Sequence, residues 1–297
     1  MNASVHPELA FQAWRSERQA TVERCLSDWV APGAATDLGL AMRYAVLDGG
    51  KRLRPLLTLA TSEAVQGAPQ AAMRAACAVE LIHAYSLVHD DMPCMDNDVL
   101  RRGKPTVHVQ FGQAQALLVG DALQALAFEL LVPEDASMLP SQSAAMCRLL
   151  ALSAGADGMA GGQAVDLASV GKSLNQAELE AMHRLKTGAL LQASVLMGAA
   201  SAQPSATEKS HLARFGACLG LAFQVVDDVL DVTADSGTLG KTAGKDAADD
   251  KPTFVALLGL AAAQAYAQAV LDQAHDALNA SGLPHSTHLH ALADWVG

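Results

Sequence analysis

The sequence has few aromatic residues, and this shortage limits the kind of core that the chain can build. Aromatic side chains make up only 4% of the 297 residues, whereas hydrophobic residues as a whole make up 51%. The core must therefore consist mostly of Ala, Leu, Val and Met. Ala and Leu lead the helix propensity scale, and aromatic residues belong to the strand formers. The composition therefore favours an all-α fold.

Positive charge is also scarce. The chain carries 20 Lys and Arg against 31 Asp and Glu, which gives a net charge of −11. This charge argues against nucleic acid as a partner, because phosphate backbones require a basic surface. It leaves room for a small anionic substrate that is held by metal ions and a few local cations.

Paired cysteines and long hydrophobic runs are absent as well. The five cysteines are widely spaced without a CxxC pair, so neither a disulfide framework nor a zinc site is predicted. The N-terminal stretch lacks the apolar segment of a signal peptide. The longest apolar runs, FVALLGLAAA and FGACLGLAF, are too short to span a bilayer. We therefore expect a cytoplasmic protein without stable membrane insertion.

Apolar residues recur at helical spacing along nearly the whole chain. The clearest segments are 38–47, 70–91 and 115–131. Pro93 should end the second of these, because proline cannot continue a helix. No change of composition marks a domain boundary. Residues 1–297 are therefore expected to form a single all-α domain, a helical bundle.

Two further helices have recognisable starts. Asn175 with Glu178 three positions later forms a capping-box pattern, and we expect the same pattern to begin at Thr207. The polar stretch 233–251 contains three glycines and is predicted to be a mobile loop. An Ala-rich pair of helices is expected to close the chain.

Two groups of aspartates stand at the ends of apolar helical segments. Asp227 and Asp231 are four positions apart, which places them on one helix face. Crowded carboxylates resist ionisation unless a cation compensates, and ligands that offer only oxygen select a hard ion such as Mg²⁺. A solvated turn or face is the alternative for each group taken alone. The groups contain Asp90, Asp91, Asp96 and Asp98, and then Asp227, Asp228 and Asp231.

Basic residues accompany both acidic groups. Lys186 and Thr187 lie in an apolar helical segment, where a lysine usually requires an anion. Acidic metal sites ringed by Arg and Lys indicate phosphate chemistry. A surface basic patch is the alternative for the motif GGKRLRP taken alone. The other cations are Lys51, Arg52 and Arg54 of that motif, Arg101, Arg102, Lys241, Lys245 and Lys251.

Several motifs carry a family resemblance. They are LIHAYSLVHDDMPCMDNDVLRRGKPTVH, GGKRLRP, GDALQALAFELL, MAGGQAVDL, LKTGALL, AFQVVDDVLDV and LGKTAGKD. In this order and spacing the chain resembles the trans-isoprenyl diphosphate synthases, most of all the bacterial short-chain farnesyl diphosphate synthases. The resemblance covers about residues 40 to 260.

The resemblance implies a helical bundle with a central apolar cavity and a reaction in three stages. The allylic diphosphate ionises with help from three Mg²⁺ ions, for which Mn²⁺ is an alternative, isopentenyl diphosphate attacks the cation, and a proton is lost. Dimethylallyl and then geranyl diphosphate would be extended to farnesyl diphosphate. The implied metal ligands are Asp90, Asp91, Asp96, Asp227, Asp228 and Asp231.

The resemblance also assigns the residues that bind substrate. His83 is one of them, although this histidine taken alone could instead be a buried core residue without a role in binding. The implied catalytic residues are Lys186, Thr187, Gln224 and Arg101. Of these, Thr187 and Gln224 would stabilise the carbocation. The isopentenyl diphosphate site would comprise Lys51, Arg54, His83 and Arg102, and the allylic diphosphate site Arg101, Lys186, Lys241 and Lys251.

Product length depends on the wall of the cavity. The resemblance places Tyr85 where an aromatic floor stops growth at fifteen carbons, although Ser86 lies directly below Asp90 on a helical wheel. MPCMDND also resembles plant geranylgeranyl synthases, so a twenty-carbon product is the first alternative. A non-catalytic subunit of a prenyl synthase and a class I terpene cyclase are others. The resemblance implies a homodimer that binds small isoprenoid diphosphates.

Overall fold

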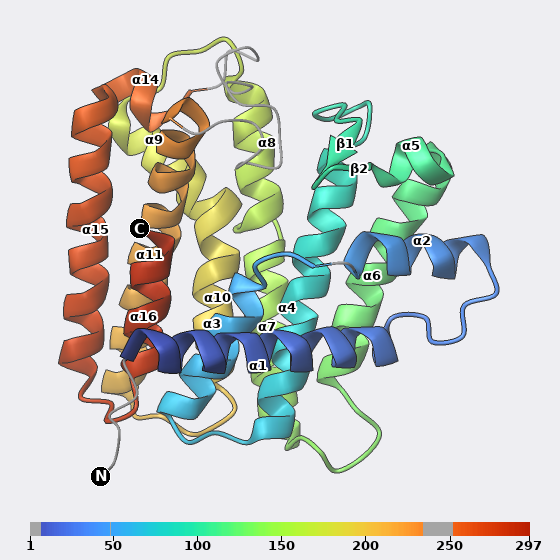
Figure 1. Ribbon diagram of the computed structural model, residues 1–297, viewed down its shortest axis with the longest axis horizontal. Helices are drawn as coiled ribbons and strands as arrows, with labels where there is room; N and C mark the ends of the chain where they lie inside the picture. Colours follow the sequence, from blue (N-terminus) through green and yellow to red (C-terminus); the bar gives the residue numbers. More distant parts are fainter. Residues whose placement is uncertain (1–6, 48, 234–251) are drawn as a thin grey trace.

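The computed structural model describes residues 7–47, 49–233 and 252–297, and it is almost entirely helical (Figure 1). A short antiparallel hairpin joins β1 (Leu100–Arg101) to β2 (Lys104–Pro105). The prediction of an all-α bundle is confirmed. The helices are α1 (Pro7–Trp29), α2 (Asp37–Val46), α3 (Leu53–Ala64), α4 (Pro69–Asp90), α5 (Val107–Phe111), α6 (Gln113–Leu131), α7 (Pro140–Ala154), α8 (Met159–Ser169), α9 (Gln176–His183), the π-helical η1 (Arg184–Gly188), α10 (Ala189–Ala199), α11 (Ala206–Thr233), α14 (Phe254–Leu258), α15 (Leu260–Ser281) and α16 (Thr287–Val296).

The predicted helix limits agree closely with those of the structure. Helices α2, α4 and α6 begin and end within two residues of the predicted segments. Helix α4 ends at Asp90, Asp91 is its C-cap, and Pro93 follows. The proline therefore acts as expected, because it lies just beyond the last helical turn.

One of the two predicted capping patterns is confirmed, and the other is wrong by two residues. Asn175 and Glu178 form the expected capping box at the start of α9. At α11 the reciprocal bonds join Ser205 to Glu208, with 2.7 Å from the Ser205 amide to Oε2 and 3.2 Å from the Glu208 amide to Oγ. Thr207 lies inside the helix. The residue three positions after it is Ser210, whose side chain is too short to bond to the Thr207 backbone amide as a capping box requires. The predicted loop 233–251 lies outside the described residues except for Thr233, which ends α11.

The bundle is organised around α4 and α10. Helix α4 packs against α3, α6 and α10, and α10 also packs against α11, which in turn packs against α15. Helix α1 crosses the long helices of the bundle (Figure 1). Small residues permit close approach: a Cβ on Gly198 of α10 would lie 2.3 Å from the Thr58 carbonyl oxygen of α3. The core forms two clusters, one around α4 and α6 and the other around α3, α11 and α15.

Helices α4 and α6 are long and apolar enough to cross a membrane by length and composition. Most of the apolar window of α4 is buried (67%), as expected for the core helix of a protein folded in water. Only 39% of the corresponding window of α6 is buried. Helix α6 therefore keeps an apolar face that the described part of this chain does not cover.

Contacts between aromatic rings pack α14 against its neighbours. The Phe254 ring is fully buried, with its centre 5.6 Å from that of His183 in α9 and 5.7 Å from that of Tyr266 in α15. The Tyr266 hydroxyl donates a 2.6 Å hydrogen bond to Glu180. His183 is buried as well, and neither ring nitrogen has a hydrogen-bond partner among the described residues.

We predict that His183 makes the fold less stable in acid. Burial, the largest cause, lowers its pKa to about 4; Lys186 acts in the same direction and Asp166 opposes it. Because a histidine in an unfolded chain titrates near pH 6.5, this stabilisation is complete above that pH and is lost as the pH falls towards 4. The free energy of unfolding should lose about 2 kcal/mol between pH 7 and pH 5 from this residue.

Urea unfolding of His183→Phe at both pH values measures this contribution. The variant keeps an aromatic ring against Phe254 but cannot take up a proton, so its stability should fall less in acid than that of the wild type. Replacement of the exposed His285 by Phe is the matched control and should leave the difference unchanged. Equal pH dependence in wild type and His183→Phe would contradict the prediction.

Candidate active site

A pocket of about 470 Å³ lies between α4, α8, η1 and α11. Asp90, the last residue of α4, and Asp227 of α11 both line it, so the two acidic groups of the sequence meet at one pocket. Its volume falls in the usual range for small-molecule sites. The lining residues are Arg54, His83, Tyr85, Ser86, Leu87, His89, Asp90, Met95, Met159, Ala160, Gln163, Ala164, Leu167, Lys186, Thr187, Phe223, Gln224 and Asp227.

Lys186 and Thr187 reach the pocket from a widened helical turn. They lie in η1, a π-helical turn between α9 and α10. Two glycines allow neighbouring helices to approach this turn closely, because they lack a side chain. A Cβ on Gly162 of α8 would lie 2.1 Å from the Lys186 backbone nitrogen, and a Cβ on Gly220 of α11 would lie 2.7 Å from the Gly188 Cα. Single π-turns of this kind are frequent at functional sites.

Lys186 has an anionic partner. Its ammonium group forms an ion pair with Asp166 of α8, whose side chain is buried. Three residues earlier, Gln163 lines the pocket, and its buried amide atoms have no hydrogen-bond partner among the described residues. Helix α8 therefore supplies polar groups that support the pocket.

Asp90 is held in a setting that resists its ionisation. Burial, the largest cause, raises its pKa to about 6; Asp96 and Asp91 raise it further, while Lys186 and Arg101 oppose the rise. The turn that brings Asp96 close is closed by a 2.9 Å hydrogen bond from the Asp96 amide to the Asp90 carbonyl oxygen. A cation bound beside Asp90 would favour its charged form.

Asp91 has a different partner. Its two carboxylate oxygens accept hydrogen bonds from Arg101, with 2.9 Å from Nε to each oxygen and 2.5 Å from Nη2 to Oδ1. Burial raises the pKa of Asp91, and the hydrogen bonds with Arg101 counteract this rise. Asp91, Arg101 and Arg102 line a separate small pocket next to the hairpin. The two neighbouring aspartates of the first group thus have different surroundings.

The second acidic group divides in the same way. Asp227 lines the main pocket, whereas Asp228 is only 2% exposed. Asp228 accepts a 2.8 Å hydrogen bond from the Phe254 amide and a 2.9 Å bond from Gln224 Nε2. Thr187 Oγ1 donates to Gln224 Oε1 over 2.9 Å. Asp231, one turn beyond Asp227, is buried in α11.

The donor set at the pocket suits Mg²⁺ shared with a ligand. In the described part of the chain, no three Asp, Glu, His or Cys side chains converge to hold an ion by themselves. Mg²⁺ is typically bound by one or two carboxylates, with water and substrate phosphates completing the shell. Asp90, with its raised pKa, and Asp227 on the second helix meet this description.

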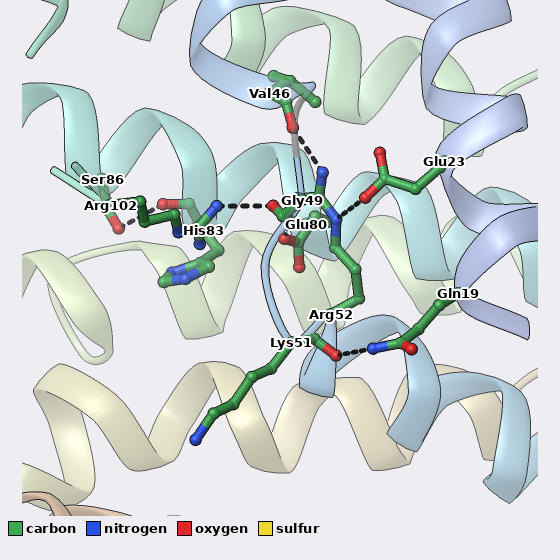
Figure 2. A network of polar contacts seen from close by, with 10 residues as sticks. All are labelled: Gln19, Glu23, Val46, Gly49, Lys51, Arg52, Glu80, His83, Ser86 and Arg102. Atoms are coloured by element: carbon green, nitrogen blue, oxygen red, sulfur yellow. Dashed lines mark hydrogen bonds and ion pairs between the residues drawn. The ribbon is translucent and has the colours of Figure 1, made fainter. Parts of the chain in front are cut away.

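The motif GGKRLRP divides into one structural and two accessible cations. Arg52 is buried and bonded through its guanidinium to Glu23 (2.7 Å), to Glu80 (2.7 Å) and to the Val46 carbonyl oxygen (2.6 Å), as Figure 2 shows. Lys51 is exposed, with its ammonium 5.9 Å from the centre of the Trp295 ring. Arg54 lines the pocket. Arg52 therefore holds the motif in place, while Lys51 stays exposed and Arg54 reaches the pocket.

Arg54, His83 and Arg102 form a site with excess positive charge. Burial lowers the pKa of Arg54 to about 10, opposed by Glu80 and reinforced by Arg102. Burial, together with Arg54 and Arg102, keeps the pKa of His83 well below its ordinary value. Burial first, and then the neighbouring positive charge, thus favour the neutral form of His83. An anion would relieve this excess, so the cluster suits a phosphate group.

Gly49 and Gly50 position Arg102. The guanidinium donates a 2.8 Å hydrogen bond to the Gly49 carbonyl oxygen (Figure 2). It also lies flat against Gly50, where an added Cβ would come within 2.9 Å of its atoms. Both glycines have positive φ, +93° and +121°, which other residues rarely adopt.

The pocket gathers nine of the residues singled out in the sequence, and others lie around it. Arg101, Arg102 and Asp91 border the neighbouring small pocket, and Lys51 lies by α16. Lys241 and Lys251 lie outside the described residues. Asp166, Gln163, His89 and Phe223 were missed, although MAGGQAVDL and AFQVVDDVLDV contain three of them. The nine are Arg54, His83, Tyr85, Ser86, Asp90, Lys186, Thr187, Gln224 and Asp227.

Comparison with known proteins identifies the family of the chain. Residues 36–282 match the family model described as polyprenyl synthetase. The chain belongs to the polyprenyl synthetase family. It is 48% identical over 273 residues to a probable farnesyl diphosphate synthase of Sinorhizobium fredii, covering 90% of this chain and 82% of that protein. It is 45% identical over 287 residues to the chloroplastic geranylgeranyl pyrophosphate synthase of Capsicum annuum, covering 96% and 78%.

A solved structure extends the likeness to three dimensions. A geranyltransferase from Helicobacter pylori, complexed with magnesium and isoprenyl diphosphate, has a TM-score of 0.86 and 35% identity, covering 99% of both chains. The resemblance found in the sequence is thereby confirmed, and the protein is a prenyl-transferring enzyme of this polyprenyl synthetase family. Relatives with different product names are about equally similar, so membership of the family does not fix product length.

We predict that Gly50→Ala weakens anion binding at the cluster of Arg54, His83 and Arg102. The new Cβ would displace the guanidinium of Arg102, and the positive φ of position 50 adds backbone strain, as it does at position 49. Loss of one charged hydrogen-bond donor should weaken the binding of inorganic diphosphate by about tenfold in calorimetry. Gly49→Ala is the matched control, since it introduces backbone strain but meets nothing within 4 Å. Equal binding by the two variants would contradict a role for Arg102.

Proposed function

We propose that the protein is a Mg²⁺-dependent farnesyl diphosphate synthase, which condenses isopentenyl diphosphate with dimethylallyl and then geranyl diphosphate. One observation carries the proposal: Asp90 and Asp227 come from different helices to a single pocket that also contains Lys186, Arg54 and apolar side chains. Carboxylates and cations suit a metal diphosphate, and the apolar wall suits a hydrocarbon chain.

The carboxylates facing the pocket would hold the metal. We assign this role to Asp90 and Asp227, with Asp96 and Asp231 of the same acidic groups as further ligands. Bound Mg²⁺ neutralises the charge that develops on the departing diphosphate. Asp91 accepts hydrogen bonds from Arg101 and Asp228 accepts one from the Phe254 amide, and we assign these two carboxylates to those contacts.

The cations complete the two diphosphate sites. Lys186 stands at the pocket beside Asp90, and its pairing with Asp166 fixes the direction of its ammonium group. We assign Lys186 and Arg101 to the allylic diphosphate, together with Lys241 and Lys251. The cluster of Arg54, His83 and Arg102, with Lys51, would hold isopentenyl diphosphate, because it combines positive charge with access to the same pocket.

Polar groups of the pocket would stabilise the carbocation. The Thr187 hydroxyl donates a hydrogen bond to Gln224. The lone pairs of the Thr187 oxygen can therefore face an electron-poor carbon. Phe223 and Met159 contribute apolar surface to the same pocket. Such surface excludes water, which would otherwise capture the cation.

Tyr85 would set the length of the product. Tyr85 lines the pocket five residues before Asp90, the last residue of α4, and its ring lies edge-on to His89 with centres 5.7 Å apart. Ser86 lines the pocket too, so the helical wheel and the motif agree that this part of α4 forms the wall. Synthesis of a twenty-carbon product is the second candidate, supported by the similarity to the pepper geranylgeranyl synthase.

We further propose a cytoplasmic homodimer built on α6. Leu117 and Leu118 on this helix are each 49% exposed, and Val109 of α5 is 50% exposed. A second copy would cover this apolar face, which a monomer in water would leave exposed. A catalytically inactive subunit is the alternative, but both acidic groups are intact in this chain.

The direct experiment is incubation with dimethylallyl and isopentenyl diphosphates and Mg²⁺, followed by chromatography of the products. A fifteen-carbon product is expected, and chelation of the metal should abolish it. A twenty-carbon product would replace the farnesyl assignment with the geranylgeranyl one. No turnover would favour a non-catalytic subunit.

Removal of either carboxylate at the pocket should nearly abolish catalysis. Asp90→Asn and Asp227→Asn each take away a proposed metal ligand, so kcat should fall by about 100-fold or more. Asp272→Asn, at an exposed position on α15, is the control and should retain full activity. Near-normal turnover in both pocket variants would rule out the proposed metal site.

Shortening the aromatic wall should lengthen the product. Tyr85→Ala opens the pocket beyond the fifteen-carbon position, and we expect a shift towards products of twenty carbons and more. Tyr85→Phe keeps the ring and should keep the wild-type product. If Tyr85→Ala gives the same product distribution as the wild type, another residue forms the floor.

A further inference from the structure

Asp228 stands at the centre of a chain of hydrogen bonds that ends in the pocket. The Phe254 amide donates to its Oδ2 over 2.8 Å, and Gln224 Nε2 donates to its Oδ1 over 2.9 Å. Thr187 Oγ1 then donates to Gln224 Oε1 over 2.9 Å. Each link lies within normal hydrogen-bond distance, so the start of α14 is joined to the pocket through α11 and η1.

The direction of each bond in this chain follows from the chemistry of Asp228. A carboxylate can only accept hydrogen bonds, so it turns the NH₂ group of Gln224 towards itself. The amide oxygen of Gln224 must then face Thr187, and the Thr187 hydroxyl must donate. The lone pairs of the Thr187 oxygen are thereby directed away from Gln224, which is the orientation that an electron-poor ligand in the pocket requires.

The packing around Phe254 closes this chain into a ring of contacts. The Phe254 ring lies against His183, which directly precedes η1. Gln224 and Asp228 are four residues apart on α11 and therefore share one helix face. Asp228 is 2% exposed and Phe254 is fully buried, so water does not compete for the hydrogen bond between these two residues. Helix α14, α11 and η1 are thus held in one fixed arrangement.

We propose that Asp228 is a positioning residue that orients Gln224 and Thr187, and that it does not bind the metal. This inference rests on the proposed function, since it assigns roles within the same pocket. The two adjacent aspartates then have different roles. Asp227 faces the pocket and binds the metal, whereas Asp228 faces inwards and orients the polar groups that meet the carbocation.

Asparagine variants of the two aspartates separate these roles. Asp228→Asn retains the shape but has one acceptor and one donor group, so it cannot accept from both Phe254 and Gln224. Its kcat should fall by about tenfold or more, while calorimetry should show Mg²⁺ and inorganic diphosphate binding within about twofold of the wild type. Asp227→Asn should weaken that binding by about tenfold or more.

Two results would overturn the proposal. If Asp228→Asn weakens the binding of Mg²⁺ and diphosphate as much as Asp227→Asn does, Asp228 is a ligand. If kcat per folded molecule is unchanged while only the thermal unfolding temperature falls, Asp228 is a structural anchor without influence on the reacting groups.

A double variant tests the hydrogen-bond chain itself. When Asp228→Asn is combined with Gln224→Glu, the new amide oxygen at position 228 accepts from Phe254, and the new NH₂ group donates to the new carboxylate at position 224. Thr187 still donates to that carboxylate. Every link is kept and the total charge is unchanged. Gln224→Glu alone places two acceptors against each other and should be the least stable of the set.

The double variant should unfold at a higher temperature than Gln224→Glu, and its kcat should exceed the product of the two single effects by about tenfold. Additive effects on both quantities would contradict the proposal, even if Asp228→Asn alone fails to fold. Unfolding and diphosphate binding need no turnover. A wild type that makes no prenyl product would therefore refute the proposed function, while these measurements still decide the role of Asp228.

Discussion

The structure depends on how carboxylates are kept close together at one end of an apolar bundle. Asp90 and Asp227 approach the same pocket from α4 and α11, and burial raises the pKa of Asp90 to about 6. Such an arrangement is costly without compensating positive charge. Lys186 supplies part of it, and a bound metal ion supplies the remainder in the proposed reaction. In the proposed reaction, the crowded carboxylates would attract Mg²⁺, and the metal ion would in turn bind the diphosphate.

Neighbouring residues of each motif have different surroundings in the bundle. In both acidic groups one aspartate faces the pocket and the next is bonded elsewhere, Asp91 to Arg101 and Asp228 to Gln224 and Phe254. In GGKRLRP the buried Arg52 holds the backbone for its exposed neighbour. Successive helical residues point in directions about 100° apart, so adjacent positions cannot all reach one ligand.

Much of the fold and of the site could be predicted from the sequence, because helical spacing and charge clusters are local signals. The limits of α4 and the capping box at Asn175 followed from them. The π-helical turn could not be predicted, because no local pattern indicates it, and the close packing of Gly162 and Gly220 against it joins residues far apart in the sequence. The partner of Lys186, Asp166, lies on α8, and no sequence spacing reveals that contact. The inward direction of Asp228 likewise depends on Phe254, 26 residues away.

The central claim is that Asp90 and Asp227 share a metal-bound diphosphate. The most direct measurement is a crystal structure of the protein grown with Mn²⁺ and inorganic diphosphate, with the ions located by their anomalous scattering. We expect Mn²⁺ in direct contact with both carboxylates and with the diphosphate, and none in contact with Asp228. Diphosphate bound with no ion at either Asp90 or Asp227 would contradict it.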